Sequence, residues 1–550
     1  MKFLEKYKIV LTRILSCVIL ITSLSVHVHA AKATKAKKWG AKAMNYLIGI
    51  DIGTSATKTV LFDETCQVIQ SASQEYPLYQ PQNGWAEQEP LDWYSAVVRT
   101  VKKVVQESGV PAEAIKGIGL SGQMHGLVML NEANEVIRPA IIWCDQRTGK
   151  ECEEITRRVG AKRLIEITAN PALTGFTASK ILWVRNHEAE NYKACRHILL
   201  PKDYVRFRMT GDYATEVSDA SGMQLLDVPN RCWSKEILEK LEIDESLLPK
   251  VYESPEVTGH VSEEFAEKTG LTTATLVVGG AGDNAAAAVG TGIVEDGRAF
   301  TTIGTSGVVF AHTSEPRIDP KGRVHTFCCA VPGCWHVMGV TQAAGLSLKW
   351  FRDTLAEKYK DEAVLKGVDS YDLINQDVAK VPIGSRRLFY LPYLMGERTP
   401  HLNPDCRGVF FGLSAIHTKA DMLRSVMEGV SYSLLDCFDV LKEMKVDVQE
   451  MMACGGGGKS RIWRQMLADM YACEVKTIKA QEGPALGVAI LAGVGAGLFP
   501  DVPTACRQFI QQDTWCQPEP SAHAYYEKGH KLYQKLYSQL KECYSELAIL

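Results

Sequence analysis

A single carboxylate, Asp283, stands among small residues in the segment GGAGDNAAAAVGTG, residues 279–292. Small neighbours leave room for a substrate beside the acid. A carboxylate in a closed, partly dry cleft has a raised pKa and becomes a better base. We therefore expect Asp283 to accept a proton in catalysis. An alternative or additional role is to cap the helix predicted from Asn284 onward, which would keep the acid ionised and close to bound phosphate.

Two Gly-Thr-Ser turns could bind a polyphosphate. Ile-Gly-Thr-Ser occurs at 52–55 and again at 303–306, each time between β-forming segments. A tight turn with free N–H groups and two hydroxyls forms an anion site, although each turn taken alone could be an ordinary β-turn. The residues predicted to contact phosphate are Thr54, Ser55, Gly304, Thr305 and Ser306.

Asp51 directly precedes the first of these turns. Magnesium is commonly bound by one or two carboxylates together with substrate phosphates, so Asp51 is the predicted Mg²⁺ ligand, directly or through water. The second turn has Thr302 at the equivalent position. The metal-binding acid therefore occurs once, and Asp51 joins Asp283 as a predicted catalytic residue.

Two further glycine motifs resemble nucleotide-binding fingerprints without meeting their requirements. GIGLSG, residues 117–122, lies within a predicted strand, whereas a dinucleotide fingerprint must open a helix. GGGGKS, residues 455–460, fails the P-loop spacing because Ala453 stands where a glycine is required. The four glycines still permit close approach of a flat ligand or a phosphate.

The elements that must position these residues are strands alternating with helices, which indicates an α/β protein. Residues 44–63 and the segment IKGIGLSGQMHGLVMLN each read as strand, turn, strand. Residues 90–108 form an amphipathic helix, and a longer helix follows Thr418, which makes a capping box with Asp421. The repeated Ile-Gly-Thr-Ser predicts two related halves that join near residue 295.

Composition excludes several classes of protein. The chain has 550 residues, a net charge of −3 and 46% hydrophobic residues, as expected for a soluble globular protein of two or more domains without a nucleic-acid footprint. Its 16 cysteines are scattered, and only Cys328, Cys329 and Cys334 cluster, without zinc spacing. We expect reduced thiols in a cytosolic protein.

Residues 1–43 conflict with that compartment. A basic start is followed by an apolar run from Ile14 to about Val28 and by a small-residue pattern ending at Ala30, as in a signal peptide or weak anchor. The run is short for a membrane span. The alternative is an upstream start codon, since Met44 opens a natural domain beginning, MNYLIGIDIGTS.

Many spaced motifs in order resemble the FGGY carbohydrate kinases, from about residue 44 to 545. They include IGIDIGTSATK, GLSGQMHGLVML, TGFTASKILWVRNH, GGAGDNAAAAVGTG and GGGGKSRIWRQMLAD. The resemblance implies two ribonuclease-H-like, actin-type ATPase domains that flank a central catalytic cleft. Residues 44–295 would bind the sugar and supply the base, 296–550 would bind ATP, and 1–43 would be a disordered extension.

The resemblance also implies the substrates, D-xylulose and Mg-ATP, and assigns Asp283 as the catalytic base. The sugar-binding residues that it implies are Gln123, Met124, His125, Asp283 and Asn284, and those that contact adenosine are Gly455, Gly456, Gly457 and Gly458. Trp143, Asp145 and Arg147 would line or brace the sugar pocket, or form a structural salt bridge beneath it.

One position departs from the family pattern, because members that phosphorylate this sugar often have Asn where Cys144 stands. Related kinases that act on ribulose, gluconate or glycerol therefore stay open as alternatives, as does a non-catalytic actin-like ATP-binding sensor. We expect a cytoplasmic enzyme without nucleic-acid partners or stable membrane association, and residues 1–43 not to act in export. A homodimer is one candidate assembly.

Overall fold

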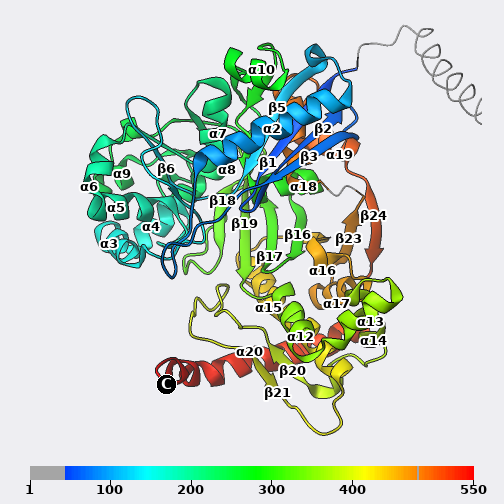
Figure 1. Cartoon of the computed structure of the whole chain (residues 1–550). Helices are drawn as coiled ribbons and strands as arrows, with labels where there is room; N and C mark the ends of the chain where they lie inside the picture. Colours follow the sequence, from blue (N-terminus) through cyan, green and yellow to red (C-terminus); the bar gives the residue numbers. More distant parts are fainter. Residues whose placement is uncertain (1–43, 480–481) are drawn as a thin grey trace, which may run out of the picture. The chain divides into compact units, whose positions relative to one another are not determined.

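The computed structural model describes residues 44–479 and 482–550, and Asn45–Leu550 cluster as one unit (Figure 1). The predictions for residues 1–43 lie outside the described residues. In the part that is described, no helix combines the length and the apolar character needed to cross a bilayer.

The first large sheet has the strand order β13-β14-β5-β1-β2-β3, and β15 also pairs with β5. β1 and β2 form the predicted antiparallel hairpin, and β5 runs parallel to β1. GIGLSG lies within β5, as expected. The strands are β1 (Tyr46–Ile52), β2 (Ala56–Asp63), β3 (Val68–Glu75), β5 (Ile115–Gly122), β13 (Val257–His260), β14 (Leu276–Val278) and β15 (Ala281–Gly282).

The second large sheet has the order β18-β19-β17-β16-β22-β23-β24. If β1, β2, β3, β5, β14 and β13 are matched with β16, β17, β19, β22, β23 and β24, every pairing and its direction recurs. The predicted repeat thus extends over six strands of each sheet, and β15 and β18 lie outside the match. The strands are β16 (Gly297–Ile303), β17 (Gly307–Thr313), β18 (His325–Cys328), β19 (Trp335–Thr341), β22 (Val448–Cys454), β23 (Glu474–Ile478) and β24 (Gln512–Cys516).

Helices and short two-stranded sheets surround the two large sheets. The helices are α2 (Pro90–Ser108), α3 (Gly149–Val159), α4 (Ala161–Thr168), α5 (Thr177–His187), α6 (Ala189–Ala194), α7 (Pro201–Thr210), α8 (Val217–Ala220), α9 (Lys235–Leu241), α10 (Glu263–Thr269), α11 (Asp283–Thr291), α12 (Gly345–Leu355), α13 (Lys358–Lys366), α14 (Ser370–Val378), α15 (Lys419–Glu443), α16 (Gly455–Gly458), α17 (Arg461–Tyr471), α18 (Gly483–Gly495), α19 (Val502–Phe509) and α20 (Pro520–Ala548). The short strands pair as β4 (Glu87–Gln88) with β7 (Ala140–Ile141), β6 (Val128–Leu130) with β8 (His197–Leu199), β9 (Ala214–Glu216) with β12 (Lys250–Tyr252), β10 (Leu226–Asp227) with β11 (Cys232–Trp233), and β20 (Phe389–Leu391) with β21 (Val409–Phe411).

Two helices test the predicted amphipathic patterns. α2 covers the predicted range and begins with proline at its first position. α15 has the predicted capping box of Thr418 and Asp421. β17, β19 and β20 and three helices pack around α15 and bury nearly every side of it from Leu423 to Leu441, so this helix lies in the core.

α11 and α18 follow equivalent strands of the two halves and cross each other in backbone contact. A Cβ atom on Gly290 would lie 1.8 Å from the carbonyl oxygen of Gly483, and one on Gly487 would lie 1.9 Å from that of Ala286. Only glycine fits at such a contact. Part of the smallness around Asp283 therefore serves helix packing.

α18 also packs on the first sheet, although it follows β23 of the second (Figure 1). A Cβ atom on Gly49 of β1 would lie 1.9 Å from the carbonyl oxygen of Ala485, and one on Gly119 of β5 would lie 2.0 Å from that of Val488. Apolar side chains of α18 join those of β1 and β2 in one buried core.

Candidate active site

Adjacent strand ends bring Asp51 and Asp283 together. Asp51 on β1 pairs with Ser121 on β5, and Ser121 pairs with Ala281 on β15. β15 leads directly into α11, whose first residue is Asp283. Burial, and next the charge of Asp51, raise the pKa of Asp283 to about 7.

The structure corrects one expectation about Asp283. The N-cap residue of α11 is Gly282, and Asp283 occupies the first helical position without capping the helix. From there its Oδ1 reaches only the neighbouring residue and accepts hydrogen bonds from the backbone N–H and the side-chain amide of Asn284, at 2.7 and 2.9 Å. These two hydrogen bonds lower the pKa of Asp283, but burial and the charge of Asp51 raise it by more. The helix N-terminus therefore does not keep this acid fully ionised.

Asp51 has the features of a cation ligand. Its Oδ1 is buried and has no hydrogen-bond partner among the described residues, and burial raises the pKa of the carboxyl. Buried polar atoms are rarely left without a partner, and a carboxylate oxygen is the ligand type that Mg²⁺ prefers. The residue therefore fits the predicted metal.

A cavity of about 770 Å³ lies along the same helix. Gly455 and Gly458 of α16 line one part of it, and Ala287 and Thr291 of α11 line another. Residues four apart share a helix face, so these two lie on the face that begins with Asp283. The remaining lining residues are Phe300, Thr302, Ala453, Cys454, Lys459, Arg464, Thr477, Ile478, Lys479, Gly483, Pro484, Asp513 and Thr514. The cavity has the size of a cofactor site and carries cationic side chains suited to an anion.

The two Gly-Thr-Ser turns have different surroundings. In the second turn, the carbonyl oxygens of Gly304 and Thr305 accept hydrogen bonds from the first turn of α12, and the Thr305 side chain is exposed. In the first turn, Ser55 is exposed, whereas the Thr54 hydroxyl lies 3.3 Å from the Gln123 carboxamide oxygen. The predicted contact of these turns with phosphate stays a prediction.

Gln123 belongs to a buried hydrogen-bond chain. Its amide nitrogen donates to Gln88 at 2.8 Å, and Gln88 accepts a bond from Trp93 at 3.2 Å. Gln88 also donates to the carbonyl oxygen of Thr54 at 2.7 Å. This chain fixes the first turn relative to β5.

Met124 and His125 follow directly after β5. Met124 packs against Gly282, where an added Cβ atom would lie 2.9 Å from its side chain, so it adjoins Asp283. His125 has a φ of 69°, and its Nδ1 lies 3.0 Å from the carbonyl oxygen of Gly222. Because a carbonyl only accepts, Nδ1 carries the proton and Nε2 is free to accept a hydrogen bond. Burial lowers the His125 pKa to about 3, which makes the imidazole neutral and a poor base.

The residues around Trp143 divide into two roles. Arg147 makes buried ion pairs with Asp145 at 2.7 Å and Glu87 at 2.8 Å, which is the structural salt bridge weighed as an alternative. Trp143 is 44% exposed, and its indole donates to the Thr54 hydroxyl at 2.9 Å.

Sequence reasoning missed Lys180. This buried side chain donates to the carbonyl oxygens of His125 at 3.1 Å, Phe176 at 3.3 Å and Gly175, and burial lowers its pKa to about 7. It therefore holds the backbone that carries His125. Because its partners are carbonyl groups, which every residue has, the only sequence signal was its place in TGFTASKILWVRNH.

A buried ionic network beneath Asp283 was missed as well. Lys202 lies 2.6 Å from Asp203 and less than 4 Å from Glu216 and Asp219. Lys202 also donates to the carbonyl oxygen of Gly279, and Ser218 accepts a bond from the N–H of Gly282. The network thus fixes the backbone just before Asp283.

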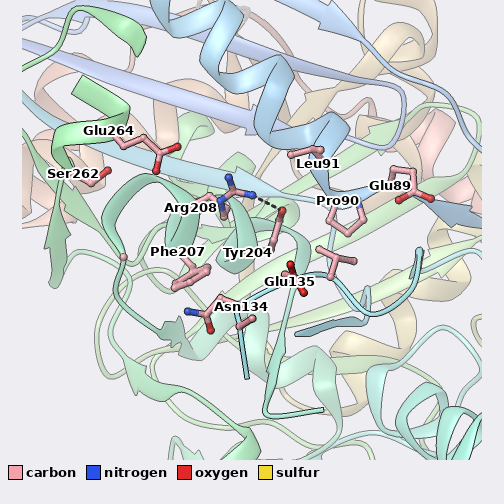
Figure 2. Close-up of a pocket in the computed structure, with 13 residues that line it drawn as sticks. Glu89, Pro90, Leu91, Asn134, Glu135, Tyr204, Phe207, Arg208, Ser262 and Glu264 are labelled. Atoms are coloured by element: carbon pink, nitrogen blue, oxygen red, sulfur yellow. Dashed lines mark hydrogen bonds between the residues drawn. The ribbon is translucent and has the colours of Figure 1, made fainter. Parts of the chain in front are cut away.

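Figure 2 shows a separate cavity of about 600 Å³ near the N-terminus of α2. It is lined in part by Glu89, Tyr204, Phe207 and Arg208, and Arg208 donates to the Tyr204 hydroxyl at 3.1 Å. None of the predicted site residues lines it.

The structure contains two similar sheets, two neighbouring acids, Asp51 and Asp283, and a glycine-lined cavity. Together they define a two-domain α/β kinase of the actin-like ATPase type. Residues 46–290 match the N-terminal domain of the FGGY family of carbohydrate kinases, and residues 299–496 match its C-terminal domain. The chain belongs to this family. The predicted boundary near residue 295 stays a prediction.

Named relatives cover nearly the whole chain. It is 40% identical to the xylulose kinase of Bacillus subtilis, over 91% of this chain and 98% of that protein. A crystal structure of a "xyloylose kinase" from Brucella ovis superposes with a TM-score of 0.84 at 34% identity, covering 91% of this chain and 100% of the other. The gluconokinase of B. subtilis is 34% identical, over 81% of this chain and 87% of that protein.

Proposed function

We propose that the protein transfers the γ-phosphoryl group of ATP to the terminal hydroxyl of D-xylulose, which yields ADP and D-xylulose 5-phosphate. The observation that carries this proposal is the shared face of α11, where Asp283 lies in line with the cavity-lining Ala287 and Thr291. A nucleotide held against Gly455 and Gly458 would then direct its phosphates toward a sugar beside Asp283. The choice of D-xylulose follows the activity named for the relatives.

Asp283 acts as the general base. Phosphoryl transfer requires positioning, neutralisation of charge and a group that accepts the hydroxyl proton. A base works best when its pKa lies near the working pH, and that of Asp283 is about 7. Its carboxylate takes the proton as the sugar oxygen bonds to phosphorus.

Asp51 would hold Mg²⁺, directly or through water. The ion would supply neutralisation of the phosphate charge. The Gly-Thr-Ser turns, 53–55 and 304–306, present hydroxyls and the N–H groups of their Thr and Ser residues to the phosphates, because the N–H groups of Gly53 and Gly304 already donate within the turns. Their positions in equivalent hairpins of the two sheets support this role.

His125 Nε2 accepts a hydrogen bond from a sugar hydroxyl, and Asn284 and Met124 complete the sugar site. The neutral imidazole and the hydrogen bond from His125 to Gly222 support this role. Gln123, predicted as a further contact, is buried and supports the site through its hydrogen bonds to Gln88 and Thr54.

Phosphorylation of gluconate is the second candidate. After burial and Lys180, the charge of Arg398 also lowers the His125 pKa, so a further cation lies in the electrostatic surroundings of the proposed sugar site. A cation there suits a sugar acid, and a gluconokinase is among the relatives.

A coupled assay over D-xylulose, D-ribulose, D-gluconate and glycerol tests the proposal. We expect D-xylulose to have the highest kcat/KM, and a higher value for another substrate would refute the specificity. Asp283→Ala should abolish transfer while ATP binding stays measurable. Unchanged turnover would refute the mechanism, and no activity with any sugar in the wild type would favour a non-catalytic sensor.

We also propose that the protein works in the cytoplasm, where ATP and sugar phosphates are found, and that residues 1–43 are not an export signal. Mass spectrometry of the native protein tests this. A mature N-terminus near Ala31 with extracellular recovery would refute it.

A further inference from the structure

Three side chains with thiol or imidazole groups meet on one face of the second sheet. β18 and β19 pair through Cys328 and Trp335, so the next opposed pair is Cys329 and Cys334, joined by a 3.1 Å hydrogen bond from the Cys329 N–H to the Cys334 carbonyl oxygen. On β17, His312 lies diagonal to Cys334 and on the same face. None of the three belongs to the predicted catalytic or binding set.

The two cysteines face each other across the strand pair, and their environments differ. His312 lies diagonal to Cys334 on the neighbouring strand. Cys329 is buried in the core, whereas Cys334 is partly exposed. His312 is in turn held through its Nδ1, which lies 3.3 Å from Asp296. An accessible thiol thus has a buried thiol on one side and an oriented imidazole on the other.

An ion pair lies next to the Cys334 backbone. Arg231 donates to the Cys334 carbonyl oxygen at 2.7 Å and is paired with Glu253 at 2.6 Å. The hydrogen bond from Cys329, then the His312 imidazole, and more weakly Arg231, lower the pKa of the Cys334 thiol to about 5 against the opposing effect of burial. Such a thiol is a thiolate at neutral pH, and the thiolate is the nucleophilic form.

We propose that Cys334 and Cys329 form a peroxide-reactive thiol pair, in which Cys334 is oxidised first and Cys329 resolves it to a disulfide. The Cys334 thiolate attacks one oxygen of hydrogen peroxide and the O–O bond breaks. Hydroxide is released, and Cys334 becomes a sulfenic acid. The Cys329 sulfur then attacks the Cys334 sulfur, the S–O bond breaks, and water leaves with the thiol proton. The pair loses two electrons, and one peroxide is reduced to one water and one hydroxide, which takes a proton from the solvent to become the second water.

Peptide mapping of the full-length protein tests the reaction. The wild type is treated with one equivalent of hydrogen peroxide at pH 7, remaining thiols are alkylated, and oxidised peptides are identified by mass spectrometry. We expect the disulfide between residues 329 and 334 to form before the exposed Cys232 is modified. Oxidation of Cys232 first, or a Cys334 that stays reduced, would overturn the proposal.

The pH dependence of alkylation separates ionisation from exposure. Burial raises the pKa of Cys232, although its side chain is the more exposed. We expect the rate at Cys334 with iodoacetamide to be constant above about pH 6, while that at Cys232 rises about tenfold per unit. A thiolate of lower pKa is intrinsically less nucleophilic, so the expected advantage of Cys334 at pH 6 is only about tenfold. Parallel profiles would contradict the ionised state of Cys334.

Two variants separate the roles of the thiols. Cys329→Ser should leave a Cys334 sulfenic acid that dimedone labels, because no resolving thiol remains. Cys328→Ser is the matched control, since that side chain points to the opposite face and donates to Val228 at 3.5 Å. Disulfide formation that survives Cys329→Ser, or that is lost in Cys328→Ser, would count against the assignment.

Discussion

Asp283 is partly buried at the start of α11, next to the strand end that carries Asp51, and burial together with the charge of Asp51 places its pKa at about 7. Only the ionised form can accept a proton. We therefore expect kcat/KM for the sugar to fall about tenfold per pH unit below pH 7 and to level off above it. The coupled assay measured from about pH 5.5 to 8.5 checks this, and a flat acid limb would exclude Asp283 as the base.

The same shift predicts a stability effect of Asp283→Asn. The folded-state pKa is raised from 3.8 to about 7, so between these values the native protein binds the extra proton and its stability falls as pH rises. The Asn variant lacks this loss. We expect it to be inactive, yet more stable at pH 8 by up to about 4 kcal/mol, with the gain vanishing near pH 4.

Denaturant unfolding at pH 8 and at pH 4 measures the difference in stability between the wild type and Asp283→Asn. Asp361→Asn, an exposed substitution on α13, is the control and should change stability little at either pH. A loss of stability at pH 8 in Asp283→Asn would contradict the raised pKa.

Gly487→Ala should destabilise the crossing of α11 and α18. The added Cβ atom would lie 1.9 Å from the carbonyl oxygen of Ala286, so the helices must move apart, at a cost of about 1–3 kcal/mol or more. At Gly149, an added Cβ atom meets nothing within 4 Å, so Gly149→Ala is the matched control. Equal Tm values for the two variants would show that the crossing tolerates separation.

Lys180→Met should raise the KM for the sugar about tenfold or more while leaving the KM for ATP unchanged. The substitution removes the hydrogen bonds that hold the backbone of His125, each worth about 1–3 kcal/mol. Lys162→Met serves as the control because that side chain is 92% exposed. An equal rise in both KM values would indicate a general structural role.

Local signals made part of this structure predictable. The turn residues between β1 and β2, the proline that opens α2 and the Thr418–Asp421 capping box act within a few residues of the chain. The repeated Ile-Gly-Thr-Ser also pointed correctly to two related halves. Asp283 and Asp51 could be named because each lies beside recognisable small or turn residues.

The remaining features depend on contacts between distant segments. The pKa of Asp283 depends on β5 bringing β1 and β15 together, which no single segment encodes. The small residues of α11 were read as space for a substrate, whereas Gly290 is required by Gly483 on another helix. Lys180 acts through backbone carbonyl groups, which carry no residue-type signal, and Lys202 pairs with Glu216 and Asp219, which lie 14 and 17 residues further along the chain.

The position of α18 on the first sheet has a consequence for synthesis on the ribosome. Leu47 and Phe62 share one buried core with apolar side chains of α18, residues 483–495, which are translated long after the first sheet. Part of the apolar face of that sheet therefore stays exposed until α18 has been synthesised. We expect a fragment of residues 44–295 to aggregate when expressed alone and to become soluble when 296–550 is co-expressed. The two halves thus mature together, in one late step, rather than in the order of their synthesis.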